Sequence, residues 1–522
     1  MFKKPLAVTA ACAAILLSAS PAFADAPNVS SPLVLVANTA SACASHKATI
    51  PLRATSTPVN ATINWGDGTI TNYQNTTLAS HSFATPGPHQ ISISGTLPAL
   101  GSYYGYLTPS SCITQVVQWG STGLTDLTGA FANDSQLRKL PSSLPSSVKS
   151  LSYAFYNDPA FNAPISSWNT ASVTDLSFAF AKDTAFNQPI GSWDVAHVTD
   201  LTSTFENASA FNQPLAKWNT ARVTRMDGTF NQATSFNQPI GSWNTSNVVS
   251  MVAMLNSAKH FNQPLSTWNT ALVRDMAGMF TYDAAFNQPL AAWNTSHVTN
   301  MSGMFEMTNY NQPLAAWNTS SLVYAGDMFA FDAAFNQAIG SWNTSNVTDF
   351  SWMFEDAAAF NQPIGSWKTS NVTNMSGMFS FDTAFNQPLA TWNTSRVTTM
   401  ALMFQGTHMN KPLSSWNTSH VTNMYAMFRQ DSAFNQSLGT WNLSSIAPAQ
   451  SSTSPDSLTS MFDASGLSST NYGLTLVAWA SRAEPLGLHL GASGVKFPLS
   501  ASVTRKSLMQ SYHWTISDAG KV

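Results

Sequence analysis

Charged residues are scarce in this sequence. Only 22 of its 522 residues are Lys or Arg and 25 are Asp or Glu, which is 9% of the chain and gives a formal net charge of −3. A nucleic-acid-binding protein needs clustered Lys and Arg to neutralise phosphates, and no such cluster occurs here. We therefore expect no nucleic-acid partner and only weak long-range attraction of charged ligands.

Motifs of known chemistry are also missing. The sequence contains no G-x-S-x-G, H-E-x-x-H, P-loop or C-x-x-C motif. An active site needs unique residues, whereas the polar residues here mostly recur at a fixed period. A glycosidase would need two carboxylates about 5–10 Å apart, and the sparse acids form no unique cluster. We expect no enzyme, no cofactor and no metal site.

Long apolar runs are confined to the N-terminus. Residues Met1–Ala24 have a Lys-Lys start, an apolar run and Ala-Phe-Ala before Asp25. This pattern predicts a secretory signal peptide cleaved after Ala24. No other run approaches about 18 apolar residues, so we expect no transmembrane span. The chain is thus predicted to be exported, as a secreted or cell-surface protein.

Cysteine is rare, with three residues in the chain. Cys12 lies in the predicted signal peptide, which leaves Cys43 and Cys112 in the exported part. Export favours a disulfide between these two residues; two free thiols are the alternative.

What the sequence has in abundance is one 25-residue phrase. A clean copy, FNQPIGSWKTSNVTNMSGMFSFDTA, occupies Phe360–Ala384, and Phe385 begins the next. Its Trp recurs twelve times, at 25-residue steps with two steps of 24, at 168, 193, 218, 243, 268, 293, 317, 342, 367, 392, 416 and 441. A strict period of this length indicates a stacked array in which neighbouring copies share one core.

Each copy is predicted to contain two short strands and one helical or 3₁₀ turn. The strands are expected at Gln-Pro-Ile/Leu and at Val-Thr-x-Met, with parallel pairing between successive copies. The turn is expected at Met-x-x-Met-Phe, which has helical spacing. Stacked in this way the copies would form a rod. We expect the Trp row to be buried core, although an exposed row would make a sugar-binding platform. The periodic Asn residues are expected to form side-chain ladders that satisfy turn backbone.

The first copies suggest a family. In Leu124–Phe161 the pair Ala-Phe recurs, ending at Phe131 and Phe155, and Leu137, Leu140, Val148 and Leu151 fill the apolar positions. This pattern resembles the leucine-rich repeats of BspA-like bacterial surface proteins, and the resemblance covers about Trp119–Phe462. It implies a leucine-rich-repeat-like solenoid over residues 119–462 and adhesion to proteins or to other cells.

The segment before the repeats is predicted to form β-strands. Residues 61–69 are ATINWGDGT, and residues 81–95 are HSFATPGPHQISISG. Alternating apolar residues bounded by Gly and Pro indicate strands. WGDG followed by HxFxxPGxHxIxIxG resembles the PKD type of immunoglobulin-like β-sandwich, which we place at residues 25–118. The resemblance implies that Trp65 and Asp67 are fold residues; a calcium role for Asp67 is the alternative.

The end of the chain departs from the repeat. We expect helices at Ser469–Ser481 and Ser500–Tyr512 and a short strand at Leu488-His-Leu, with Leu474, Val477 and Ala478 on the buried face of the first helix. A repeat array needs an atypical terminal unit to cover its open core. Residues 463–522 are therefore predicted to be a small α/β cap on a mainly β chain.

Two positions vary within the otherwise strict phrase, namely the residue before Val and the x of Val-Thr-x-Met. Variation inside a fixed phrase suggests exposure to solvent, so these residues should line up along the array. We define the variable stripe, the candidate binding residues, as His197, Arg222, Arg225, Asn247, His297, Asn346, Asn371, Arg396 and His420. A plain solvated face is the alternative, and Asp175 beside Asp200 could hold a calcium ion.

These observations favour an exported interaction or adhesion protein that presents an extended face to an extracellular protein. The alternatives are a carbohydrate-binding module that uses the repeated Trp and Asn, which would make the partner a glycan, and a structural envelope protein. Burial or exposure of Trp293 and its equivalents distinguishes the interaction protein from the carbohydrate-binding module, because only exposed indoles could bind a sugar.

Overall fold

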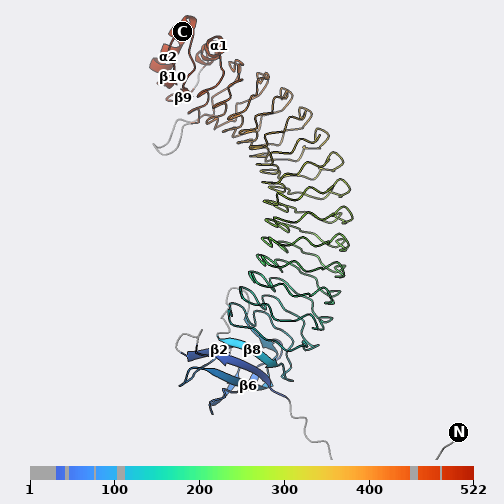
Figure 1. The fold of residues 1–522 in the computed structure, drawn as a ribbon. Coiled ribbons are helices and arrows are strands. Elements are labelled where there is room, and N and C mark those ends of the chain that lie inside the picture. Colours follow the sequence, from blue (N-terminus) through green and yellow to red (C-terminus); the bar gives the residue numbers. More distant parts are fainter. Residues whose placement is uncertain (1–30, 41–45, 76–77, 103–111, 447–456, 483–484) are drawn as a thin grey trace, which may run out of the picture.

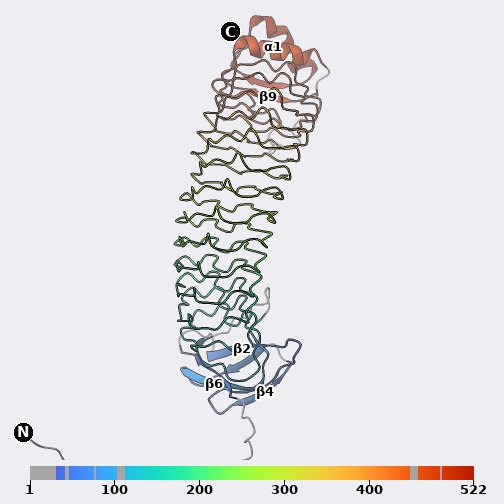
Figure 2. The ribbon, with the colours of Figure 1, turned by 90° about the vertical axis from the view of Figure 1, so that its right-hand side faces the viewer.

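The structure is a computed structural model that describes residues 31–40, 46–75, 78–102, 112–446, 457–482 and 485–522. A β-rich unit lies at one end, a bowed stack of turns follows, and a small helical unit closes the other end (Figure 1). Seen from the side, the turns lie one over another as rungs (Figure 2). The chain is mainly β with tandem repeats and few helices.

The N-terminal unit consists of antiparallel strands in two groups. One sheet has the order β4 (Ile70–Gln74), β3 (Asn60–Asn64), β6 (Pro88–Thr96), β1 (Leu33–Asn38) and β8 (Ile113–Gln118). The other has the order β5 (Leu78–Ser82), β2 (Lys47–Arg53) and β7 (Ala99–Leu100). The alternating residues of β3 illustrate the pattern, since Ala61 and Ile63 are buried between exposed Asn60 and Asn64.

The stack continues directly from this unit. Ala99 of β7 and Gln115 of β8 form parallel bridges to Asp126 and Lys139 of the first turns. Arg53 of β2 reaches across the same junction, with Nη2 2.8 Å from a carboxylate oxygen of Asp126. The strands of the first unit therefore cover the open end of the repeat core, as an array requires.

Within the stack, most backbone hydrogen bonds between successive turns lie along one side. The x residue of each Val-Thr-x-Met, here the ladder residue, forms a parallel bridge to its equivalents before and after, from Asp126 to Asn423. In the turn at Asp200 the inter-turn bonds run from Thr199 N to Thr174 O, Leu201 N to Arg225 O, Ser203 N to Asp227 O, Phe205 N to Thr229 O and Asn207 N to Asn231 O. The parallel pairing predicted at Val-Thr-x-Met is present, although each turn contributes one bridged residue.

On the other side of each turn, side chains make the inter-turn bonds. The Asn after Phe accepts from the next copy, with Asn162 Oδ1 3.0 Å from Asn187 N and 2.9 Å from Gln188 Nε2. Each indole also donates to the preceding turn, as Trp193 Nε1 does to Ile165 O at 3.1 Å. No strand forms at Gln-Pro-Ile/Leu in the described copies. That prediction was wrong because Pro has no N–H for a ladder and the Asn side chains supply the bonds.

The predicted helical turn at Met-x-x-Met-Phe is also wrong. The segment is a run of hydrogen-bonded turns, such as Thr204 N to Leu201 O and Glu206 N to Ser203 O. Two residues in each run have left-handed backbone, Ser203 at φ 50° and Asn207 at φ 55° in this copy. A right-handed helix cannot pass through such residues. The i, i+3, i+4 spacing arises because Leu201, which precedes the left-handed Ser203, and Thr204 and Phe205, which follow it, are all buried in the core.

The difference between the two sides explains the bow. Backbone-paired strands lie about 4.8 Å apart, whereas the stacked indole centroids of Trp168 and Trp193 are 6.2 Å apart. The phenyl rings between them have an intermediate spacing, 5.7 Å for Phe354 and Phe379. The turns therefore fan out from the ladder towards the Trp row, and the ladder lies on the concave side of the arc in Figure 1.

The two 24-residue copies keep the core in register. Tyr310 and Met409 occupy the buried position that Phe fills elsewhere. In both copies the lost residue is compensated by a Thr that reaches an Asp of the next turn. Thr308 Oγ1 and Thr407 Oγ1 each lie 2.8 Å from Oδ2 of Asp332 and Asp431, respectively.

The C-terminal cap has the predicted helices and strand and one further strand. It contains α1 (Ser469–Ala480), β9 (His489–Ala492), the 3₁₀ turn η2 (Leu499–Ala501), α2 (Ser502–Ser511) and β10 (Thr515–Asp518), which pairs parallel with β9. The buried face of α1 was assigned wrongly, because Tyr472, Leu476 and Trp479 are buried whereas Leu474 and Val477 are exposed. The two aromatic rings fill the end of the core that the repeats leave open.

Candidate binding surfaces

The variable stripe lies on the surface. Eight of its residues are exposed and Asn371 is half-buried. Its members that precede Val form one column, one per turn, whereas Arg225 is a ladder residue and lies in a second column. Arg225 is held by Asp227, with Nη2 2.9 Å from Oδ2. The structure thus brings eight of the nine predicted residues into one line.

Several stripe residues already bond to the turn before them. Asn247 Nδ2 donates to Ala221 O at 2.7 Å, and Asn346 and Asn371 make the equivalent bonds. His297 Nδ1 lies 3.0 Å from Ala271 O. Arg396 Nη1 donates to Asn371 Oδ1 at 3.0 Å, which joins two stripe residues. The Asn members therefore cap backbone, and the His and Arg members carry most of the stripe's capacity for a partner.

The proposed calcium pair has local partners. Asp175 and Asp200 are bridged neighbours, so they lie side by side as expected. Asp175 Oδ1 accepts from Ser177 N at 2.8 Å, and Asp200 Oδ1 accepts from Thr202 N at 2.7 Å. Across the described residues, no three His, Cys, Asp or Glu side chains converge as metal ligands. Both carboxylates act as turn caps, a role that Asn300 fills in the same column.

The WGDG segment is built as a turn. Trp65 is fully buried, and Asp67 Oδ1 accepts from Thr69 N at 2.9 Å. The Oδ2 atom of Asp67 lies 2.6 Å from His81 Nε2. This hydrogen bond and that of Thr69 lower the pKa of Asp67 to about 2. These contacts give Trp65 and Asp67 a structural role.

Two predictions lie outside the described residues. The signal peptide Met1–Ala24 is not described, and neither is Cys43. Cys112 is buried and immediately precedes β8. The Cys43–Cys112 disulfide therefore stays a prediction. Among the described residues, no helix is both long and apolar enough to span a membrane.

The Trp row is core. Trp293 is 3% exposed, stacks on Trp268 at 5° between ring planes, and donates from Nε1 to Leu265 O at 2.9 Å. The other indoles from Trp168 to Trp441 are buried to the same degree. An indole face covered by its neighbours cannot stack on a sugar. The sugar platform is thereby excluded, and the carbohydrate alternative loses the feature on which it depended.

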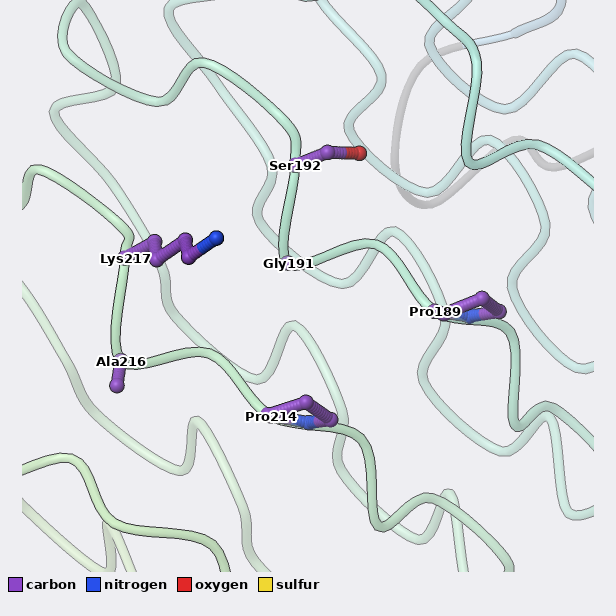
Figure 3. A pocket seen from close by; sticks show the side chains of 6 residues that line it. All are labelled: Pro189, Gly191, Ser192, Pro214, Ala216 and Lys217. Atoms are coloured by element: carbon purple, nitrogen blue, oxygen red, sulfur yellow. The ribbon is translucent and has the colours of Figure 1, made fainter.

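Shallow hollows lie between some of the turns. One of about 370 Å³ is lined by Pro189, Gly191, Ser192, Pro214, Ala216 and Lys217; Figure 3 shows the two prolines in equivalent places on adjacent turns. A similar hollow occurs at Pro239–Thr267, and another, without Pro in its lining, occurs at Gly365–Asn393. A Cβ on Gly191 would lie 2.3 Å from Pro214 O, so Gly permits this close approach. Because the hollows repeat with the turns and Lys217 is the one charged group lining the first, they are features of the stacking.

Further variable columns on the ladder side were not predicted from the sequence. These are the residues three, six and seven places after the ladder residue, beside the left-handed turns. They vary from turn to turn, and they include Tyr282 at 47%, Phe331 at 38% and Phe381 at 41% exposure. The column seven places after the ladder residue is exposed or half-buried in the described turns, whereas the other two columns are outward in some turns and buried in others, as Ser203 and Ser380 are. The signal was present in the sequence, since the two residues after Met-Phe vary as freely as the stripe does.

Stacked copies of one short phrase, with constant core residues and variable outward columns, define the chain as a tandem-repeat protein. The family described as "Mycoplasma protein of unknown function, DUF285" matches residues 125–234, 213–309, 289–381 and 363–461. These overlapping matches cover more than half of the 522 residues, so the chain belongs to this family. The match is consistent with the resemblance to BspA-like surface repeats. No curated protein matches the chain.

Proposed function

We propose that the protein is an exported interaction or adhesion protein, secreted or held at the cell surface. In this proposal a leucine-rich-repeat-like solenoid presents an extended face to an extracellular protein. One observation carries it: core residues are nearly constant from turn to turn, whereas outward columns on the ladder side change their chemistry. Constancy inside is explained by stacking, and stacking gives no reason for the outward variation.

We further propose that the N-terminal strands form a PKD-like sandwich that acts as the first cap of the array, after removal of Met1–Ala24 as a signal peptide. The role proposed for the whole chain is non-catalytic. It is supported by the periodic polar residues, whose side chains are engaged in ladders and turn caps, as Asn162 and Asp200 are.

The test is solid-phase binding of Asp25–Val522 to a panel of matrix proteins and polysaccharides. The stripe variant carries Arg222→Ser, Arg396→Ser, His297→Ser and His420→Ser. A matched variant changes two Lys and two His outside the stripe: Lys217→Ser, Lys259→Ser, His260→Ser and His408→Ser. Binding to a protein that the stripe variant loses and the matched variant keeps would support the proposal.

Two other outcomes would overturn it. Binding to glycans alone, unchanged in the stripe variant, would favour a carbohydrate-binding module that uses other residues than the buried Trp row. Absence of binding to every panel member would favour a structural envelope protein.

A further inference from the structure

Although the net charge of the chain is low, Asp and Glu outnumber Lys and Arg in the middle of the stack. No Lys or Arg occurs between Arg274 and Lys368. The same stretch contains eight acids: Asp275, Asp283, Glu306, Asp327, Asp332, Asp349, Glu355 and Asp356. The first turns differ, because Lys182, Arg222 and Arg225 lie among their acids. Asp283 and Asp332 are buried, and burial raises their pKa values to about 8 and about 6, so the negative charge of this segment comes from the other six acids.

Five of these acids lie together on the ladder side. Glu306, Asp327, Asp349, Glu355 and Asp356 all occupy outward positions and are exposed or half-buried. Glu355 interacts electrostatically with Glu306, Asp327 and Asp356, which lie on three successive turns. Asp327 interacts with Asp349 in the same way. Burial, followed by these neighbours, raises the pKa of Glu355 to about 7. The five carboxyl groups are close enough to repel one another.

Among the described residues, no basic side chain is seen in an ion pair with this group. Ion pairs in the described part of the chain join Arg53 to Asp126, His81 to Asp67, Arg225 to Asp227 and Arg505 to Asp518. None of them includes the five acids, and the nearest Lys and Arg in the sequence lie at either end of the stretch. Crowded carboxylates without a counter-charge destabilise a fold. Stacking alone does not require them, because other turns have Thr, Ala, Gly or Asn in these columns.

Aromatic side chains alternate with the acids in the same columns. Phe331, Asp356 and Phe381 follow one another seven places after the ladder residue. Asp327 and Trp352 follow one another three places after it. Tyr324 and Asp349 are consecutive ladder residues. Tyr324 is 51% exposed, Phe331 38% and Phe381 41%.

The aromatic rings are held in place by the turns that follow them. A Cβ on Gly377 would lie 2.0 Å from the Trp352 ring, and a Cβ on Gly406 would lie 2.5 Å from the Phe381 ring. Each ring therefore covers a glycine of the next turn. Rings fixed in this way present a surface at little further cost in conformational entropy.

From this surface we infer that the ladder side between Glu306 and Phe381 binds an extended cationic protein segment rich in Arg or Lys. Carboxylates pair with the charged groups, and Tyr324, Phe331 and Trp352 offer rings for cation–π contact. Carboxylates spread over several turns suit a segment of several cations better than a single metal ion, which needs converging ligands. The surface covers four turns, which at about 4.8 Å per step span roughly 14 Å, about four residues of extended chain.

This inference rests on the proposed function, because it gives the interaction face a class of partner. The probe is a ten-residue peptide of alternating Arg and Gly, titrated into the purified chain and followed by calorimetry. The same peptide with Glu in place of Arg is the probe control. We expect saturable binding of the Arg peptide alone, weakened when ionic strength rises from about 0.05 to about 0.5 M.

The repeat itself supplies substitutions that the fold accepts. The acid variant carries Glu306→Gln, Asp349→Asn and Glu355→Gln, since Gln405 and Asn374 occupy the same columns. The matched control carries Asp194→Asn, Asp200→Asn and Glu206→Gln on an earlier turn and loses the same charge. We expect about tenfold weaker binding in the acid variant and little change in the control. A third variant, Phe331→Gln with Phe381→Gln, follows Gln232 and Gln430 and is expected to weaken binding several-fold.

Equal loss in the acid variant and its control would overturn the inference, because only the total charge would then matter. Absence of peptide binding would overturn it too. If the Arg peptide does not bind but the stripe variant loses binding to a protein of the panel, the proposed function stands and this inference is wrong. If no protein of the panel binds but the acid variant loses binding to the Arg peptide, the role of the stripe is contradicted and the acidic surface between Glu306 and Phe381 is supported.

Discussion

At the scale of single residues, the repeated Trp holds two turns together. Trp293 stacks on Trp268 and donates to Leu265 O of the preceding turn. We expect Trp293→Ala to lower the free energy of unfolding by about 3–5 kcal/mol, because it leaves a cavity and an unpaired carbonyl. Tyr324→Ala, at a side chain 51% exposed, should change it by about 0.5 kcal/mol or less. Guanidinium denaturation measures both; similar losses would contradict the buried assignment.

A second residue-scale prediction concerns the Asp column inside the stack. Asp283 is fully buried and its Oδ2 has no hydrogen-bond partner among the described residues. Burial raises its pKa from 3.8 to about 8, and burial raises that of Asp134 to about 8 as well. The folded chain therefore keeps protons that the unfolded chain releases. Stability should be highest below about pH 4 and fall as pH rises towards about 8, by at most about 1.4 kcal/mol per unit and group.

The variant Asp283→Ala isolates this effect, since Ala208, Ala233, Ala258 and Ala357 occupy the same column. Melting temperatures measured between about pH 5 and about pH 8 should fall less steeply in this variant than in the parent chain. Asp194→Asn, at an exposed position, serves as the control and should retain the parent slope. An unchanged slope in Asp283→Ala would mean that Asp283 ionises freely in the folded chain.

At the scale of one turn, the left-handed residues set the local shape. Ala253 has φ 51°, whereas the equivalent Gly303 has φ 62°. A Cβ is unfavourable in this region of backbone space, and Gly is not. We expect Ala253→Gly to stabilise the chain by about 1 kcal/mol or less and Gly303→Ala to destabilise it by a similar amount. Denaturation midpoints of the two variants should move in opposite directions; movement in the same direction would show that side-chain packing outweighs backbone strain.

Sequence patterns located the turns but not their hydrogen bonds. The period, the buried Trp row and the Asn ladders follow from the phrase alone, because stacking identical units puts identical residues in contact. The prediction of a helical turn was wrong because apolar spacing shows only which side chains face inward. The residue types of Ser203 and Asn207 do not by themselves indicate a left-handed backbone. The glycines at Gly228, Gly278 and Gly303 in the same column were the available signal.

The candidate site was predictable only in part for a related reason. Variation in the phrase identified exposed columns, and the stripe is exposed. Variation in the phrase could not show which exposed columns lie on the same face of the stack, because that depends on the left-handed turns. The face with Phe331 and Glu355 therefore appeared only in three dimensions. In the cap, Leu474 and Val477 were assigned to the core because apolar residues on a helix usually are, whereas Tyr472 and Trp479 fill the space.

At the scale of the whole molecule, curvature affects which partners fit. The ladder side is the shorter side of the arc, so the outward residues of its columns lie closer together than residues on the Trp side. The five outward acids and the rings of Phe331 and Phe381 are thus gathered on the concave side. A segment that follows this side can contact several turns at once, and each weak contact adds to the next.

The units at the two ends of the stack prevent its open core from associating with other copies of the chain. At the C-terminal end α1 continues the side-chain ladder, since Asn471 Nδ2 donates to Asn435 Oδ1 at 2.9 Å and Leu438 N donates to Thr475 Oγ1 at 3.0 Å. Trp479 packs near Phe462, with ring centroids 6.5 Å apart. Removing residues 465–522 would expose this last rung, which matches the ladder of any other copy of the chain.

We therefore expect the truncated chain to form larger assemblies than the full chain and to melt at a lower temperature, because an uncapped array leaves apolar core in water. Light scattering coupled to size-exclusion chromatography and a thermal melt measure the two effects. The control is Leu474→Ser with Val477→Ser, which changes the outer face of α1 while leaving the rung covered. A truncated chain with the size and melting temperature of this control would show that the repeats alone seal their own end.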